Sequence, residues 1–203
     1  MKESYFALGL MSGTSMDGVD ASIISSDGKD FYNPLYNEFF EYDKDLRQNL
    51  LSCRDRINNQ DDIFKFKEEL KILERKITLF HAELSNKILF KKKNINLDLI
   101  GFHGQTMYHD ARKKVSLQIG DGNLLAQLTK NKVIFDFRKN DLENGGQGAP
   151  LAPIFHKLLY KFTKKKNVSF LNIGGISNET LIDDKENISA KDIGPGNCLI
   201  DKW

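Results

Sequence analysis

The residues with the clearest chemical potential lie between two apolar runs near the start of the chain, 5–12 and 19–24. The segment that joins them, together with the first two residues of the second run, consists of Gly13, Thr14, Ser15, Met16, Asp17, Gly18, Val19 and Asp20. This pattern predicts a β-hairpin whose turn holds an anion, because glycines allow positive φ and close backbone approach, hydroxyls donate, and successive turn amides form a concavity. Asp17 and Asp20 suit a phosphate that carries Mg²⁺. An ordinary glycine-containing hairpin has the same pattern, so the turn alone does not decide.

A second turn of this kind follows the apolar run 168–173 and contains Gly174 and Gly175. The chain has neither a G-x-x-x-x-G-K-[ST] loop nor a G-x-G-x-x-G fingerprint, so hairpin turns would have to hold any nucleotide. Two such turns, each opening an expected domain, indicate a pair of lobes that bind one phosphate chain from both sides.

Polar side chains follow the predicted strand 97–102, where α/β sheets place ligands. They are His103, Gln105 and Thr106. His103 could act as a hydrogen-bond donor or as a base towards a substrate, or it could anchor the following loop. A metal role with His109 and Asp110 is less expected, because no third ligand clusters with them.

Another predicted strand, 133–137, leads to Arg138 and then to a glycine-rich segment that contains Gln147. The guanidinium of Arg138 could bind a carboxylate or phosphate through two parallel hydrogen bonds. A surface ion pair with Asp136 or Asp141 is the structural alternative. Pro150 suits the start of the next helix.

Asp192 is the candidate general base. It comes at the end of the predicted strand 188–193, directly before the small-residue turn 194–197. A base at the edge of a cleft needs unobstructed reach, which flanking glycines provide. An Asx turn or a helix cap is the structural alternative.

These residues need a scaffold, and the apolar spacing predicts one. The segment 43–57 has helical spacing, and residues from 61 to about 90 form a longer amphipathic pattern, predicted to be one helix packed on its own sheet. Strands at 97–102, 116–119 and 133–137 alternate with helices at 124–130 and 149–162, which indicates an α/β domain. The charged run 163–167 is followed by three further predicted strands, 168–173, 179–182 and 188–193. We therefore expect a first domain over 1–165 and the beginning of a second over 166–203. A helix is expected to start after Asn197.

Composition narrows the class of protein. The 203 residues are 40% apolar, which can fill a core, and 30 basic against 28 acidic residues give a net charge of +2. The basic residues are scattered apart from two lysine triplets, so nucleic acid is not an expected partner. Two unpaired cysteines and the lack of a long hydrophobic stretch predict a soluble, cytoplasmic protein with no membrane segment.

Six blocks of sequence resemble the anhydro-N-acetylmuramic acid kinases, a bacterial branch of the sugar kinase/heat-shock-protein/actin superfamily. The blocks are 9–20, 101–106, 118–120, 136–151, 171–178 and 192–197, in the family's order. The resemblance implies an actin-like, ribonuclease H-like ATPase lobe with a mixed sheet and helices, followed by the start of a second, similar lobe.

The resemblance also implies a reaction. ATP with Mg²⁺ would phosphorylate the 6-oxygen of 1,6-anhydro-N-acetylmuramic acid while water opens the anhydro ring, which gives N-acetylmuramic acid 6-phosphate in peptidoglycan recycling. The family aspartate that matches Asp192 activates the water, and the block around Gly13–Asp20 lies at the ATP phosphates. We place Asp17 near the metal of Mg-ATP, because hard cations prefer carboxylate oxygens. We assign sugar contacts to His103, Gln105, Thr106, Arg138 and Gln147, and further phosphate contacts to Gly174 and Gly175.

Family members are nearly twice as long as this chain. The resemblance therefore implies that most of the second lobe, with the adenosine-binding segment, is missing from these 203 residues, and we expect the chain alone to bind nucleotide poorly. A non-catalytic module that binds a sugar or a partner, and another sugar kinase of the same superfamily, are the alternatives. The resemblance also allows a homodimer.

Overall fold

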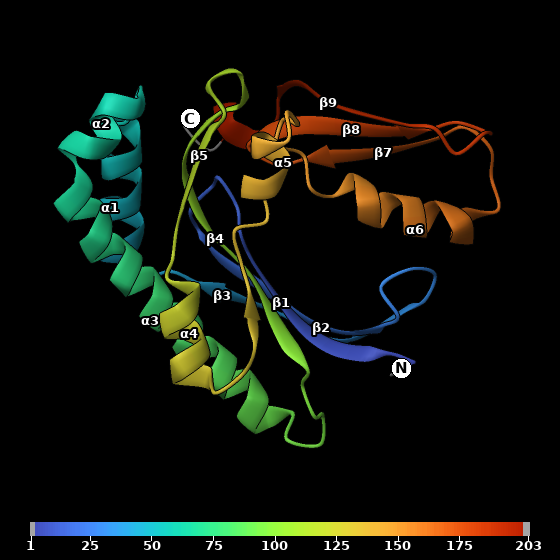
Figure 1. Ribbon diagram of the computed structural model, residues 1–203, viewed down its shortest axis with the longest axis horizontal. Helices are drawn as coiled ribbons and strands as arrows, with labels where there is room; N and C mark the ends of the chain where they lie inside the picture. The colour runs from blue at the N-terminus through green and yellow to red at the C-terminus, as the bar shows by residue number, and fades with distance from the viewer. Residues whose placement is uncertain (1–2, 201–203) are drawn as a thin grey trace. The chain divides into compact units, whose positions relative to one another are not determined.

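The computed structural model describes residues 3–200, which form a mixed α/β fold in two compact units, Met1–Gly146 and Gln147–Trp203 (Figure 1). The expected α/β class is confirmed. The division between the units lies before the helix at 153–163, whereas we expected the boundary at 165/166. This helix contacts the strands that follow it, which places it in the second unit.

A six-stranded sheet forms the centre of the first unit, in the order β3-β2-β1-β4-β5, with β6 paired to β4. Strands β1 and β2 form the predicted antiparallel hairpin, and β4 runs parallel to β1, which makes the sheet mixed. The strands are β1 Tyr5–Ser12, β2 Gly18–Ser26, β3 Tyr32–Glu41, β4 Leu99–Asp110, β5 Val115–Ile119 and β6 Val133–Ile134.

Helices α1 to α4 cover one face of this sheet (Figure 1). The helices of the first unit are α1 Lys44–Asp55, α2 Gln60–Lys65, α3 Lys67–Lys91, α4 Gly122–Thr129 and the short α5 Lys139–Glu143. The predicted apolar stripe is buried along α3, including Leu73, Ile77 and Ile88, and packs against β-strand residues such as Leu8 and Phe102. The single helix expected over 61–90 is interrupted at Phe66, whose ring lies under the guanidinium of Arg56 at 4.5 Å.

Several elements differ from the sequence prediction. Strand β3 was not predicted, because a β-bulge at Leu35 and the neighbouring Pro34 break the alternation of this edge strand. Strand β4 does not end at 102 but continues to Asp110, since it changes partner from β1 to β5 near Gln105. Strand β6 is shorter than expected, because Asp136 adopts a positive φ of 59° and the chain turns into α5.

The second unit is a three-stranded antiparallel sheet with one helix. Its elements are α6 Pro153–Thr163, β7 Val168–Ile173, β8 Ile176–Ile182 and β9 Ile188–Pro195, in the sheet order β7-β8-β9. Helix α6 begins with Pro153 at its first turn, not at Pro150 as we expected. The ring of His156 stacks on Phe170 with centroids 4.9 Å apart. The helix expected after Asn197 begins as a 3-10 turn at Asn197–Leu199, and residues 201–203 lie outside the described part of the chain.

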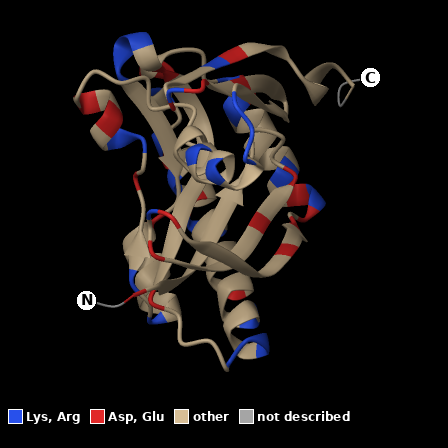
Figure 2. Ribbon diagram, turned by 90° about the vertical axis from the view of Figure 1, so that its right-hand side faces the viewer, with Lys and Arg blue, Asp and Glu red and all other residues tan. Residues whose placement is uncertain are grey.

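Charged residues of both signs are interspersed along the helices and strands of both units (Figure 2). Among residues 3–200, no helix combines the length and the apolar character needed to span a bilayer.

Candidate active site

The loop 13–17 connects β1 to β2, as the hairpin prediction required. Its positive φ belongs to Met16, at 52°, and not to Gly13 or Gly18 as we expected. The Met16 side chain is fully buried, and its N–H donates to the Gly13 carbonyl at 3.2 Å. A β-branched or bulky residue in this backbone region would be strained, whereas the unbranched methionine side chain anchors the loop in the core.

Gly18 has a packing role. A Cβ atom at this position would lie 2.3 Å from the Phe40 carbonyl oxygen and 2.9 Å from Cα of Glu41, both on β3. Only glycine therefore lets β2 approach β3 this closely. Val19 is buried as well, so the exposed or partly exposed part of the predicted phosphate-binding block is confined to Gly13, Thr14, Ser15, Asp17 and Asp20.

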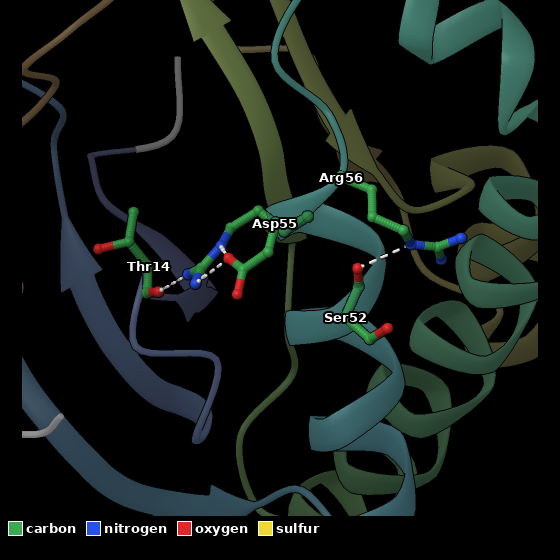
Figure 3. Close-up of polar contacts among 5 residues, drawn as sticks. Thr14, Ser52, Asp55 and Arg56 are labelled. Atoms are coloured by element: carbon green, nitrogen blue, oxygen red, sulfur yellow. Dashed lines mark hydrogen bonds and ion pairs between the residues drawn. The ribbon is translucent and has the colours of Figure 1, made fainter.

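Three donors from other elements bind the carbonyl oxygens of the loop. The Nε2 atom of Gln105 donates to the Gly13 oxygen at 2.9 Å. Nη1 of Arg54 donates to the Thr14 oxygen at 2.9 Å (Figure 3). The N–H of Tyr42 donates to the Asp17 oxygen at 2.9 Å. Within the loop, the Ser15 hydroxyl donates to Oδ1 of Asp17 at 2.6 Å. The backbone of this turn is thus fixed from outside.

A buried polar chain lies directly behind the loop. The Tyr42 hydroxyl donates to Oγ of Ser12 at 3.0 Å, and Ser12 Oγ lies 3.2 Å from Nε2 of His81 on α3. The other ring nitrogen, Nδ1, lies 2.7 Å from the Ile77 carbonyl, so Nδ1 carries the proton and Nε2 accepts from Ser12. Burial lowers the pKa of His81 to about 4 and raises the pKa of Tyr42.

The apolar spacing did not predict this hydrogen-bonded set of Tyr42, Ser12 and His81. Its signal was the set of polar residues Thr78, His81 and Ser85 within the apolar stripe of α3, all of which the structure buries. A buried polar residue needs a partner, and here the partner of His81 is the last residue of β1, next to the loop.

His103 and Arg138 contact each other, although they are 35 residues apart. Nε2 of His103 accepts from Nε and Nη2 of Arg138 at 3.1 and 2.8 Å, while Nδ1 lies 2.7 Å from the Gly104 carbonyl. Burial and the Arg138 charge lower the pKa of His103 to about 4. The imidazole is neutral, and its lone pair is taken by Arg138, so in this arrangement His103 orients the guanidinium instead of acting as a base.

The other two predicted sugar contacts on β4 differ in exposure. Gln105 is fully buried and reaches the loop, and its Oε1 has no hydrogen-bond partner among residues 3–200. Thr106 is partly exposed and accepts from Nε2 of Gln118 at 3.2 Å. Gln118 also lines a cavity of about 350 Å³ together with Lys114, Asp136 and Lys139. Gln118 belongs to one of the matching sequence blocks, but we had not assigned it a role.

In the second unit, Gly174 and Gly175 form the turn between β7 and β8. Their carbonyl oxygens accept from the N–H groups of Asn197 at 2.7 Å and Gly196 at 3.0 Å. A Cβ atom on Gly196 would lie 2.1 Å from the Gly174 oxygen, so this contact requires glycine.

Asp192 lies within the edge strand β9, which continues to Pro195 and does not end at 193 as expected. The residue that follows it, Ile193, is the extra residue of a β-bulge, since Asn178 pairs with Asp192 and Ser177 with Gly194. Bulges reorient neighbouring side chains and often occur beside active sites. The carboxylate is exposed and has no hydrogen-bond or ion-pair partner within residues 3–200. Its approach to a ligand is therefore not opposed by a competing bond.

The predicted site residues fall into two groups, and each group is described within its own unit. The loop, His103, Gln105, Thr106 and Arg138 belong to the first unit, and Gln147, Gly174, Gly175 and Asp192 belong to the second. Gln147 is exposed. Among residues 3–200, no three His, Cys, Asp or Glu side chains gather as a metal site. A cation held by Asp17 would need further ligands, such as the oxygens of a phosphate chain.

The sequence matches one protein family along nearly its whole length. Residues 5–203 match the family model of the anhydro-N-acetylmuramic acid kinases. A curated anhydro-N-acetylmuramic acid kinase of Pelagibacter ubique is 55% identical over the whole of this chain and 55% of its own length. One of Rhizobium johnstonii is 43% identical over 97% of this chain and 54% of its own length. The chain thus spans about half the length of the curated relatives that it matches.

A solved structure shares the fold. The reductive activator for a corrinoid, iron-sulfur protein aligns with 96% of this chain and 32% of its own, with a TM-score of 0.51 and 13% sequence identity. At this identity the likeness concerns the fold alone.

Proposed function

The chain belongs to the anhydro-N-acetylmuramic acid kinase family, and from this membership we propose that the protein phosphorylates 1,6-anhydro-N-acetylmuramic acid with ATP while water opens the anhydro ring. The product is N-acetylmuramic acid 6-phosphate, an intermediate of peptidoglycan recycling. The observation that carries the proposal is the loop 13–17, whose carbonyl oxygens are bound by three donors from elsewhere in the fold. Such a loop offers its amide groups to a phosphate chain.

The reaction has a simple balance. Water adds to the anomeric carbon, the bond from that carbon to the 6-oxygen breaks, and the 6-oxygen takes the γ-phosphoryl group of ATP, which leaves ADP. One proton of the water must be removed. We assign that proton to the carboxylate of Asp192, because the carboxylate is exposed on an edge strand and has no other described partner.

The residues of the loop fit Mg-ATP. The carboxylate of Asp17 is partly exposed, and carboxylate oxygens are preferred ligands of Mg²⁺, which would neutralise charge on the transferred phosphoryl group. Asp17 would hold the metal jointly with phosphate oxygens. Arg138, whose Nε and Nη2 are bound to His103, is assigned to a negatively charged group of the sugar.

The role of Asp192 is tested by Asp192→Asn in the protein expressed from its complete reading frame. A neutral amide cannot accept the proton, so we expect kcat to fall by about a hundredfold or more, with little change in the thermal midpoint. Asp184→Asn, which changes an exposed carboxylate in the turn between β8 and β9, is the matched control and should retain full turnover.

The assay follows sugar phosphate and ADP together. Near-normal turnover by Asp192→Asn would remove this carboxylate from the mechanism. If the unmodified protein formed sugar phosphate from free N-acetylmuramic acid or glucose but not from the anhydro sugar, the proposed substrate would be wrong.

A further inference from the structure

Two side chains from distant elements bind consecutive carbonyl oxygens of the loop 13–17. Gln105, on β4, donates to the Gly13 oxygen, and Arg54, at the end of α1, donates to the Thr14 oxygen. The Gly13 oxygen also accepts from the Met16 N–H. These contacts fix the direction of two peptide groups.

In a trans peptide the C=O of one residue and the N–H of the next point in opposite directions. Because the Gly13 and Thr14 oxygens are bound to Gln105 and Arg54, the N–H groups of Thr14 and Ser15 point away from these two anchors. Within residues 3–200, neither of these N–H groups donates to a protein acceptor. Successive amide donors that bind no protein acceptor can form the type of concavity that binds an anion.

We propose that Arg54 and Gln105 are positioning residues of this loop: they bind the carbonyl oxygens of Gly13 and Thr14 and thereby direct the Thr14 and Ser15 amides at the ATP phosphates. Without them, either peptide group could rotate and present an oxygen to the phosphate. The proposal changes the role of Gln105, which the sequence had assigned to the sugar. It rests on the proposed function for its kinetic readout only.

The surroundings of Gln105 support this role. Its side chain is fully buried, so it has no surface to offer to a sugar, and its amide nitrogen is bound to the loop. Its Oε1 has no partner among the described residues. The bond from Nε2 to the Gly13 oxygen is the hydrogen bond described for this buried amide.

Arg54 is held so that one nitrogen is free for the loop. Its Nε and Nη2 atoms donate to Oδ1 of Asp55 at 3.1 and 2.8 Å, and Nη1 donates to Thr14 (Figure 3). The same view contains a natural control. Arg56, two residues later, directs its Nε to the Ser52 carbonyl, on the other side of the helix, and does not contact the loop.

The test compares Arg54→Met, Gln105→Met and the control Arg56→Met in the protein from the complete reading frame. We expect Arg54→Met and Gln105→Met to raise the KM for ATP about tenfold, since each loses a hydrogen bond that supports a charged interaction, and to leave the KM for the sugar unchanged. Arg54→Lys, which keeps one donor, should recover part of the loss. Arg56→Met removes the same charge and should leave both KM values unchanged.

Two results would overturn the proposal. An equal rise in the KM for ATP in Arg54→Met and Arg56→Met would indicate a general charge effect. A rise in the KM for the sugar alone in Gln105→Met would return this residue to the sugar site. Thermal unfolding of each variant shows whether a change in KM reflects a less stable fold.

A readout without turnover separates this proposal from the proposed function. Titration with Mg-pyrophosphate, followed through the ¹⁵N-labelled amides of Thr14 and Ser15, should shift both signals in the unmodified protein and in Arg56→Met. Arg54→Met should need about tenfold more ligand for the same shift. Unmoved Thr14 and Ser15 signals at saturation would refute the proposal, even if the protein phosphorylates the sugar.

Discussion

Acidification should destabilise the protein through two buried histidines, His81 and His103. His81 and His103 both have a pKa lowered from 6.5 to about 4, mainly by burial, and their charges would repel each other. In the unfolded chain both return to ordinary values. Because the folded pKa lies below the unfolded one, the stability is fully present above about pH 6.5 and is lost as the pH falls towards the folded pKa.

The size of the loss in unfolding free energy follows from the folded and unfolded pKa values. Between about pH 7.5 and pH 5 each histidine should cost about 2 kcal/mol of unfolding free energy, so together they cost about 4 kcal/mol. This window lies above the range in which carboxylates titrate. The assay is urea unfolding followed by circular dichroism at both pH values, with the free energy of unfolding extrapolated to water.

Variants separate the histidines from general destabilisation. His81→Gln and His103→Gln should each reduce the pH-dependent loss by about 2 kcal/mol, since each removes one titrating group. Ser85→Ala is the control, because it removes a buried hydroxyl that donates to the His81 carbonyl and leaves both rings in place. A wild-type pH dependence in both histidine variants would show that neither ring is held neutral, and the reasoning would fail.

Two further predictions concern the hairpin. Gly18→Ala should lower the unfolding free energy by about 3 kcal/mol, because its Cβ would overlap the Phe40 carbonyl of β3. The control Gly9→Ala, whose Cβ would have its nearest neighbour atom at 3.9 Å, should change the unfolding free energy far less. Equal unfolding midpoints for the two variants would contradict this assignment. Asp17→Ala should raise the Mg²⁺ and ATP concentrations needed for half-maximal turnover more than the sugar concentration, and a weaker sugar response with an unchanged Mg-ATP response would show that Asp17 does not serve the metal.

The sequence predicted those parts of the fold in which local spacing and burial agree. The hairpin of β1 and β2 and the apolar stripe of α3 were both found, because each buries one regular face. Strand β3 was not predicted, because the bulge at Leu35 shifts the alternation of its side chains by one residue. The end of β4 was misplaced because His103 and Gln105 are polar, yet both are buried inside the strand, where each finds a partner that is distant in sequence.

The candidate site shows the same limit. The position of the loop could be predicted, because it connects two regular strands, whereas Arg138 lies beyond a turn after the short β6 and Asp192 lies within β9. The partners of the site residues could not be predicted, because the contacts of Gln105 with Gly13 and of His103 with Arg138 span 92 and 35 residues. A spacing pattern contains no information about such pairs until the sheet brings them together.

The two glycine-containing turns share a physical device that neither turn sequence reveals. The Gly13 oxygen is bound by Gln105 from a later strand, and the Gly174 oxygen is bound by the N–H of Asn197 from the turn after β9. In each case the donor is distant in sequence, and the amide of the following residue is directed the opposite way. An ordinary hairpin and an anion-binding one can therefore have the same turn residues. The difference lies in the donors that fix the carbonyl oxygens. The residues of the turn 13–18 therefore do not distinguish the two kinds of hairpin, and Arg54 and Gln105 are the residues on which to test anion binding.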